Sequence, residues 1–420
     1  MSEVIAALQE LAGRWEAGLE RELPAAVRLR QEVHAHPRVG GAEHDTAARI
    51  ASAMSGCLDL EPVADTGLIG RLGPAGSAIA VRAELDALPV VEASGASFAS
   101  TNGAMHACGH DLHLAALVAL TRAAEGLELP FALVPVFQPR EESQPCGARD
   151  IVRAGVLERF GIAHMIGAHV HPGVQTGAVA SGGGFVNAAA DELDIRLFGR
   201  GGHGAYPHLA ADPIAAIAQI ALALPEVVRR AVSPLHPALI SVGSLVAGAG
   251  AANVLPAYAH LRATMRTTDP EDRDRLEHAV HEAAEHIAAA FGVRAEVTLV
   301  EGEPALVNDV ELADRTEEWL TRIGVHHTEP MRSLGADDFA YYLEVVPSIM
   351  LFVGVETPGA HPEPALHDAR FLPADEHVGT VARAFLAGYL AAAEGLLRAD
   401  GTAAAESHAV AGMPGMPPAR

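Results

Sequence analysis

The sequence predicts an α/β fold in two domains: a mostly parallel, mixed sheet covered by helices, and a smaller split βαβ domain inserted into it. Three short apolar runs in the first half of the chain, an insertion with another order of elements, and the later return of the first pattern indicate this arrangement. Single hydrophobic cores stop growing near ~250 to 300 residues. The chain has 420 residues, so its length agrees with two domains.

The first part of the chain alternates between helical and buried-strand patterns. About 35 residues at the start have apolar side chains at helical spacing, and residues 112–124 form a second apolar helix candidate. The buried strand candidates are residues 79–83, 131–137 and 165–168. Strands that alternate with helices in this way form a parallel sheet whose faces are covered.

A different rhythm begins near residue 184. Two helices are predicted to begin at Asp212 and Asp269, because aspartate caps a helix and the proline that follows each one fits its first turn. With strand candidates at 193–198, 239–245, 257–266 and 295–300, the order β-α-β-β-α-β is that of the split βαβ, or ferredoxin-like, sandwich. The first pattern then returns with a helix at 312–323, a strand at 349–353 and a further helix from Val378.

These patterns predict the domain boundaries. The larger domain is expected to comprise residues 1–183 and 305–399, on either side of an insertion at 184–304. Residues 400–420 turn to Ala, Gly, Pro and Met, which is typical of a flexible tail.

Composition excludes several classes of function. With 29 basic and 53 acidic side chains the formal net charge is −24, so nucleic acid is not expected as a partner. The chain contains no lysine, which excludes Schiff-base chemistry and lysine-dependent phosphate binding. Its 3 cysteines are too few for a disulfide framework, and the amino-terminal segment lacks the positive charge of a secretory signal. We therefore expect a cytoplasmic protein.

One stretch, residues 231–261, contains no acidic residue and no arginine and is long enough to cross a membrane. Pro234, Pro237 and Pro256 interrupt it. We expect this stretch to form two buried strands joined by a turn, and we expect no membrane association.

The strongest local signal is the motif MHACGHDLH, which contains Cys108 and His110. A thiolate and an imidazole at this spacing suit a divalent transition metal. A single such pair is more often structural, because cysteine commonly acts as a small buried hydrophobe. The case for a metal site therefore depends on further ligands elsewhere in the chain.

Candidate ligands follow the predicted strands at the points where they end. Ligands bind beyond the carboxyl ends of the strands in open α/β sheets, so these side chains are expected to converge. Adjacent glutamates often form only a solvated surface, and some of the 22 histidines lie near strand ends by chance. Coincidence at several strand ends is much less expected. The residues concerned are Asp86, Glu141, Glu142, His169 and His367.

The adjacent pair Glu141 and Glu142 can divide the work of metal-assisted hydrolysis. One carboxylate binds a metal ion, while its neighbour takes a proton from metal-activated water and passes it to the leaving group. Such a site needs no activated serine or cysteine.

Eight sequence blocks in order resemble the amidohydrolase branch of the dinuclear metallo-aminoacylase and carboxypeptidase superfamily. The blocks are RAELDALPV, MHACGHDLH, FQPREE, GAHVHP, GRGGHGAYPH, NVLP with a later MRT, GADDF and ALHDARF, and the resemblance runs from about Val33 to about Phe385. The branch includes N-acyl-amino-acid amidohydrolases, hippurate hydrolases and indole-acetyl-amino-acid hydrolases. The resemblance implies a zinc-peptidase-like catalytic domain and an inserted lid domain that also pairs two subunits.

The same resemblance implies a pair of divalent metal ions, with Zn, Mn, Co and Ni all left open. The implied ligands are Cys108 shared by both ions, His110 and His169 on one ion, and Glu142 and His367 on the other. Asp86 would be a carboxylate that orients the imidazole of His110.

Four further roles are implied. Glu141 resembles the general base and acid, and His203 resembles a lid histidine that reaches the partner subunit's site and polarises the scissile carbonyl. Asn253 and Arg266 resemble residues that hold the substrate, and a guanidinium suits a carboxylate. The alternatives are a glycine-turn histidine without a role for His203 and a salt bridge inside the lid for Arg266.

The chain also departs from the family pattern. Arg140 replaces a small residue before Glu141, and we expect it to point away from that carboxylate, since facing it would favour the ionised form. Residues 143–146 replace a glycine-rich loop, and Pro-Arg-Val at 37–39 replaces Pro-Glu-Leu. Glu84 stands where relatives have aspartate and is given no ligand role.

The expected function is hydrolysis of N-acyl amino acids, which are small-molecule substrates with a free carboxylate, by a dimer or a dimer-based assembly. A dipeptidase or carboxypeptidase on the same scaffold is the first alternative. The others are an enzyme that uses Cys108 as nucleophile, and a metal-binding or ligand-binding dimer without turnover.

Overall fold

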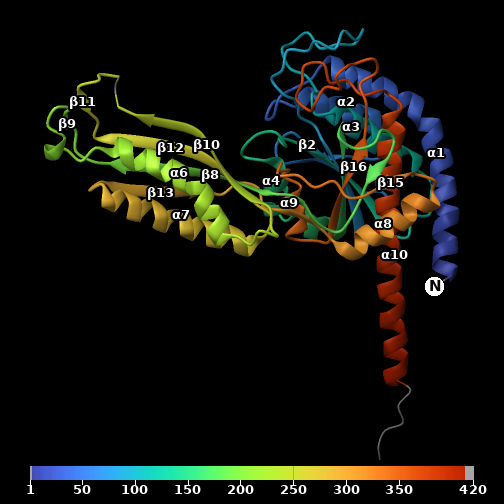
Figure 1. Ribbon diagram of the computed structural model, residues 1–420. Coiled ribbons are helices and arrows are strands. Elements are labelled where there is room, and N and C mark those ends of the chain that lie inside the picture. The colour runs from blue at the N-terminus through green and yellow to red at the C-terminus, as the bar shows by residue number, and fades with distance from the viewer. Residues whose placement is uncertain (1, 249, 412–420) are drawn as a thin grey trace, which may run out of the picture. The chain divides into compact units, whose positions relative to one another are not determined.

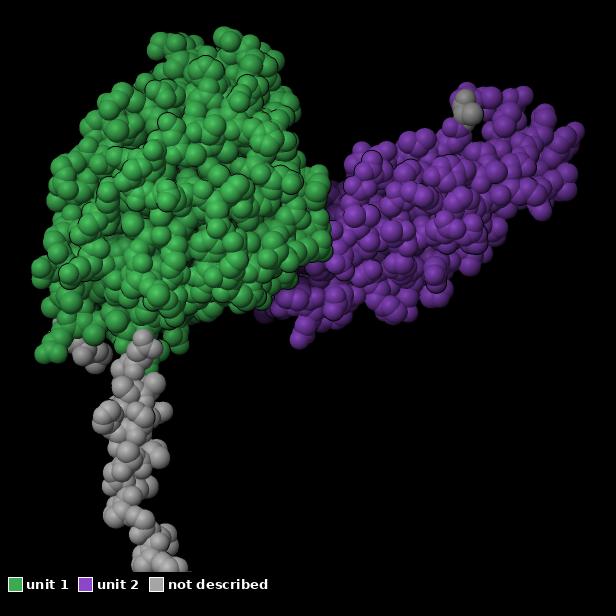
Figure 2. Space-filling model, turned by 180° about the vertical axis from the view of Figure 1, so that it is seen from behind, with its two compact units in different colours: residues 1–184, 308–331, 341–420 green, residues 185–307, 332–340 purple. Residues whose placement is uncertain are grey.

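The computed structural model describes residues 2–248 and 250–411 of the chain. The chain forms two compact units, which Figure 2 distinguishes by colour. Unit 1 consists of Met1–Gly184, Asn308–Met331 and Tyr341–Arg420, and unit 2 of Phe185–Val307 and Arg332–Ala340. Three segments distant in sequence thus build unit 1, and each unit is described by itself below.

Unit 1 contains an eight-stranded mixed sheet in the order β1-β2-β4-β3-β5-β16-β6-β15. Its four central strands run parallel and are almost entirely buried, because apolar side chains cover both of their faces. The mostly parallel α/β sheet predicted from the buried runs is therefore confirmed. The strands are β1 Glu61–Val63, β2 Gly67–Ile69, β3 Ala78–Glu84, β4 Ala132–Gln138, β5 Ile162–His171, β6 Val179–Ala180, β15 His327–Thr328 and β16 Ser348–Gly354.

Three long helices pack together on unit 1 (Figure 1). Trp15 of α1 is fully buried, donates to the carbonyl of Leu120 on α3 at 2.9 Å, and packs edge-on against Tyr389 of α10. These contacts join the two ends of the chain around α3, whose first turn carries part of the candidate site. The helices of this unit are α1 Ser2–Ala35, α2 His44–Met54, α3 His110–Ala123, α4 Gly147–Arg153, α5 Val156–Phe160, α8 Val310–Arg322 and α10 His377–Ala411. A short α9, Ala340–Leu343, spans the last boundary between the units.

Helix α10 is apolar over much of its length. Its part His377–Ala399 has the length and composition of a membrane span, but 72% of its most apolar stretch is buried. Such burial is typical of a core helix in a globular domain. The helix continues to Ala411, into the segment expected as a tail, and residues 412–420 of that segment lie outside the described residues.

Unit 2 is built on a four-stranded antiparallel sheet in the order β10-β12-β8-β13, with α6 and α7 side by side on one face (Figure 1). Asp212 and Asp269 cap these helices, since their carboxylates accept from the backbone N–H groups of Ile214 and of Glu271 and Asp272. The predicted caps and the small antiparallel domain are thereby confirmed. The elements are β8 Ala189–Phe198, α6 Pro213–Ala231, β10 Ala238–Ala247, β12 Tyr258–Thr267, α7 Pro270–Ala290 and β13 Arg294–Val300.

Short elements complete unit 2. Two short strand pairs lie outside the four-stranded sheet: the antiparallel pair of β9 Gly202–His203 with β11 Val254–Leu255, and the pair of β7 Gly184–Asn187 with β14 Leu306–Asn308. A single 3₁₀ turn, Pro207–Leu209, follows β9 among the described residues.

The expectation of two buried strands in residues 231–261 is wrong for the first of them. Strand β10 lies at the edge of the four-stranded sheet and is exposed from Ser241 to Val246. Leu245 is 44% exposed and Val246 57%. A run without charges can lie at an edge where no helix covers it, so the absence of charge alone did not indicate burial. Such an apolar edge is typical of a surface that meets another chain.

Candidate metal centre

The candidate site lies in unit 1, where the loop before α3 meets the carboxyl end of β5. Cys108 and His110 flank Gly109, which has a φ of +82°. A Cβ atom at position 109 would lie 2.4 Å from Cγ2 of Val170, so both the backbone angle and the close packing require glycine. This tight turn holds the thiol and the imidazole against the strand that carries His169.

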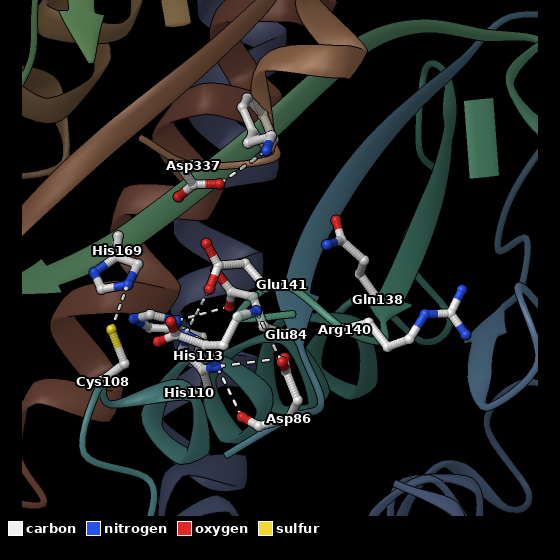
Figure 3. A network of polar contacts seen from close by, with 12 residues as sticks. Glu84, Asp86, Cys108, His110, His113, Gln138, Arg140, Glu141, His169 and Asp337 are labelled. Carbon is white, nitrogen blue, oxygen red and sulfur yellow. Dashed lines mark hydrogen bonds and ion pairs between the residues drawn. The ribbon is translucent and has the colours of Figure 1, made fainter. Parts of the chain in front are cut away.

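Two groups of potential ligand atoms overlap at Cys108. The first contains Cys108, His110 and His169, all buried, and the second contains Cys108, Glu142 and His367. Within each group the ligand atoms lie within 4.8 Å of one another. The Cys108 sulfur is 3.4 Å from Nε2 of His169 (Figure 3), and Nε2 of His367 is 3.1 Å from a carboxylate oxygen of Glu142. The structure thus gathers all five residues that the sequence resemblance named as ligands.

The buried imidazoles present the nitrogen that a metal ion would bind. Nδ1 of His110 is 2.8 Å from the carbonyl oxygen of Asp86, and Nδ1 of His169 is 2.7 Å from that of Val170. Since a carbonyl oxygen only accepts, each Nδ1 donates and each Nε2 keeps its lone pair. Nε2 of His110 is buried and has no hydrogen-bond partner among the described residues. A divalent cation bound beside the thiolate would complete this otherwise costly arrangement.

His367 reaches the site from a loop near the carboxyl end of the chain. Its backbone N–H donates to the carbonyl of Ala107 at 2.9 Å, which ties this loop to the turn that carries Cys108. Its φ is +68°, in the left-handed region that a non-glycine residue occupies at a cost of about 1 to 3 kcal/mol. Strain of this kind is concentrated at functional sites.

The two adjacent glutamates point to different parts of the site. Oε2 of Glu141 lies 3.8 Å from Nε2 of His110, whereas Glu142 meets His367. Burial raises the pKa of Glu142, but the hydrogen bond from His367 and the charge of His110 outweigh it and lower this pKa to about 2. Glu142 therefore stays an anion suited to bind a cation, and Glu141 lies beside the same atoms.

Asp86 supports the site in a different way from the one expected. Its backbone carbonyl accepts from Nδ1 of His110 at 2.8 Å. The carboxylate oxygen Oδ1 of Asp86 is farther from the same nitrogen, at 3.7 Å. The carboxylate accepts the backbone N–H of Glu142 at 2.9 Å. Asp86 thus links an imidazole of one group to the backbone of a carboxylate in the other.

The thiol of Cys108 is buried. Burial, followed by the negative charges of Glu142 and Glu141, raises its pKa well above the ordinary value. The thiolate that a metal site needs is therefore unstable here unless a cation compensates it.

Arg140 points away from the site, as expected (Figure 3). Its guanidinium binds Asp65 at 2.7 Å, Asp150 at 2.6 Å and the carbonyl of Pro145 at 3.0 Å. These three partners hold the guanidinium in place, so it does not approach the Glu141 carboxylate.

A buried ion-pair network supports α3 from the side of α1. Arg30 and His34 share a carboxylate oxygen of Asp111, at 3.0 and 3.1 Å, and His34 also contacts Glu92 at 3.1 Å. Burial alone would lower the pKa of His34, but the charge of Asp111 and the hydrogen bonds to Asp111 and Glu92 raise it to about 9. Asp111 follows the candidate ligand His110, so this network fixes the start of the helix that carries that ligand.

Replacing His34 with glutamine is expected to remove a pH-dependent part of the stability. The folded-state pKa of about 9 exceeds the ordinary value of 6.5, so this contribution is fully present below about pH 6.5 and is lost as pH rises through 9. It amounts to up to about 3 kcal/mol. Urea unfolding of wild type and His34→Gln at pH 6 and pH 10 measures it. His36→Gln, at an exposed histidine, is the matched control and should keep the pH dependence of wild type. An equal pH dependence in wild type and His34→Gln would contradict the prediction.

The expected substrate residues lie in unit 2. His203 on β9 pairs with Val254 on β11, and the N–H of Gly204 donates to the carbonyl of Asn253 at 2.8 Å, so His203 and Asn253 are neighbours. Arg266 lies on β12, where its guanidinium contacts Thr264. Their roles toward a substrate stay predictions.

Comparison with known proteins places the chain among metallohydrolases. The sequence pattern of Peptidase family M20/M25/M40 matches residues 80–399. The chain is 34% identical over 347 residues to an N-acetyl-L-cysteine deacetylase of Bacillus subtilis, covering 80% of this chain and 81% of that protein. It is 32% identical over 359 residues to an N-acetyldiaminopimelate deacetylase of Shouchella clausii, covering 84% and 94%.

A solved structure with the same fold is described as binding two metal ions. A Bacillus subtilis protein described as a dinuclear metal binding peptidase of the M20 family superposes with a TM-score of 0.77 at 29% identity. The match covers 89% of this chain and 98% of that one. The overlapping ligand groups at Cys108 agree with a site for two metal ions.

Proposed function

Because the chain belongs to peptidase family M20/M25/M40, whose members are metal-dependent hydrolases, we propose that it cleaves the amide bond of N-acyl amino acids. The observation that supports this proposal best is that two ligand groups share Cys108 and that the carboxylate of Glu141 lies beside His110. The relatives named as deacetylases of N-acetylated amino acids support the choice of substrate.

The proposed mechanism assigns the proton transfers to Glu141. A pair of divalent ions would supply Lewis acidity and lower the pKa of a water molecule toward ~7. Glu141 takes a proton from the attacking water and delivers it to the leaving nitrogen, so that the amine departs neutral. Asp86 keeps Glu142 and His110 in place during both transfers through the hydrogen bonds described above.

Recognition of the substrate is assigned to residues of unit 2. Arg266 binds the free carboxylate, Asn253 holds the substrate, and His203 from a neighbouring subunit stabilises the oxyanion. This assignment requires at least a dimer. The exposed apolar side chains of the edge strand β10, among them Val242, Leu245 and Val246, support a contact between subunits.

Removal of metal is expected to abolish hydrolysis, and added Zn²⁺, Mn²⁺, Co²⁺ or Ni²⁺ to restore it to different degrees. The measurement is release of free amino acid from a panel of N-acetyl and longer N-acyl amino acids, before and after exhaustive dialysis against a chelator. Activity that survives complete removal of metal would refute the mechanism.

The same panel separates the alternatives. Unacylated dipeptides of matched sequence test the dipeptidase or carboxypeptidase, because only that enzyme prefers a free amine. Inactivation by iodoacetamide that bound metal fails to prevent would favour Cys108 as nucleophile, since a thiolate bound to metal is shielded. Two bound ions without hydrolysis of any substrate would favour a binding protein.

A further inference from the structure

Directly behind the candidate metal centre lies a second pair of ionisable residues, His113 and Glu84. Both are fully buried, at the start of α3 and the end of β3. Nδ1 of His113 is 2.8 Å from a carboxylate oxygen of Glu84, and Nε2 of the same ring accepts the backbone N–H of Val170 at 3.0 Å. With His110 these side chains form a third potential ligand group (Figure 3).

The hydrogen bonds of His113 determine its tautomer. A backbone N–H can only donate, so Nε2 of His113 must carry a lone pair and the ring proton must lie on Nδ1. That proton is donated to Glu84. Both nitrogens are therefore engaged, which rules out His113 as a metal ligand in this arrangement.

The bond from Val170 replaces a missing strand contact. Strand β5 pairs with β3 only as far as Gly167, which is opposite Arg82. Beyond that point the N–H of Val170 donates to His113 instead of to a strand. The carbonyl of the same residue accepts from Nδ1 of His169 at 2.7 Å. Val170 thus connects the ring of His113 to the ring of a candidate ligand.

Further buried contacts fix Glu84 in turn. Its other carboxylate oxygen is paired with Arg82, whose Nε donates to Gln138 at 2.9 Å. Gln138 also accepts from the hydroxyl of Tyr342 at 2.9 Å. Burial alone would raise the pKa of Glu84, but the charge of Arg82 outweighs it and holds this pKa well below the ordinary value. Glu84 therefore remains an acceptor for the Nδ1 proton.

We propose that His113 is a positioning residue that sets the orientation of His169 through the backbone of Val170, and that Glu84 fixes the tautomer of His113 that this contact requires. Loss of this support should lower the affinity for the ion held by Cys108, His110 and His169. The affinity for the ion held by Glu142 and His367 should stay largely unchanged. The proposal rests on the dinuclear centre of the proposed function, but it concerns metal binding and not the substrate.

Two variants of His113 separate its two hydrogen bonds. In His113→Gln the amide oxygen reaches the position of Nε2 and can accept from Val170, whereas in His113→Asn the shorter amide can donate only to Glu84. We expect His113→Asn to weaken one of two bound ions about 10- to 100-fold, as loss of a group that supports a ligand does. His113→Gln should keep both affinities within about threefold of wild type.

The affected ion is identified in backgrounds that retain one ion. His169→Gln and His367→Gln each remove a ligand from one group, and Co²⁺ affinity is measured by chelator competition with the thiolate absorption band as the signal. Adding His113→Asn should weaken the remaining ion in His367→Gln but not in His169→Gln. Equal weakening in both backgrounds, as a general loss of stability would give, overturns the proposal, and so does no weakening in either.

A measurement on wild type covers the case in which His113→Asn does not fold. Nitrogen-15 spectra of the histidine side chains should show His113 protonated at Nδ1 both before and after addition of metal. A proton on Nε2, or a shift of Nε2 typical of metal ligation, overturns the proposal. A protein that binds two ions and hydrolyses no N-acyl amino acid refutes the proposed function, while the affinity comparison still decides this proposal.

Discussion

Glu141→Gln is expected to lower kcat for N-acyl amino acid hydrolysis by about 10²- to 10⁴-fold while the protein keeps both metal ions. The amide is close in size to the carboxylate but cannot accept the proton of the attacking water. Oε2 of Glu141 lies 3.8 Å from Nε2 of His110, close enough to reach a water held beside that ring. The measurement combines steady-state kinetics with metal analysis of the purified variant.

The neighbouring residue provides the matched control. Glu142→Gln replaces a carboxylate that contacts His367 and belongs with it to a ligand group at Cys108. It should therefore reduce the metal content, and excess metal should partly restore its activity. Excess metal should not restore Glu141→Gln. Loss of metal from Glu141→Gln, or activity within tenfold of wild type, would contradict the role of Glu141 as general base.

Cys108→Ala is expected to weaken both ions together, and in this it differs from variants of His169 and of His367. Its sulfur belongs to both ligand groups, whereas His169 and His367 each belong to one. Removing a group that only supports a ligand already costs about 10- to 100-fold in affinity, so each ion should lose at least ~100-fold here. Metal titration followed by calorimetry or chelator competition measures both losses.

Cys57 is the matched control for the loss of a thiol. It is half-buried, and its sulfur lies 3.9 Å from the carbonyl of Thr121 in a weak contact outside the ligand groups. Cys57→Ala should retain two ions and full activity. If Cys108→Ala kept one ion at wild-type affinity, the thiolate would not be shared. If it kept both ions but lost all activity, a nucleophilic role for Cys108 would be favoured.

The elements that sequence could predict are those with strong local patterns. The buried runs of β3, β4 and β5 stand out because both faces of a central parallel strand are apolar, and the capped helices α6 and α7 begin with Asp-Pro. Strands β1 and β2 have three residues each, and strand β6 has two. Such short segments show no periodicity, so their pairing depends on tertiary contacts that sequence does not reveal.

Sequence could predict which residues form the candidate site, but not which of their atoms make the contacts. The ligands were named from the family resemblance, and their place at strand ends agrees with the parallel sheet. Whether the carbonyl or the carboxylate of Asp86 holds His110 depends on the path of the backbone after β3. The pair of Glu84 and His113 was missed, although the spacing of His110 and His113 by three residues places both on one face of α3.

A single sulfur shared by two sites has a consequence for how the centre assembles. The buried thiol of Cys108 is protonated before metal arrives, because its pKa lies well above the ordinary value. The first cation must displace this proton, and the second then finds a thiolate already formed. Loading should therefore release one sulfur-derived proton for each pair of cations, and acidification should empty both positions as a unit.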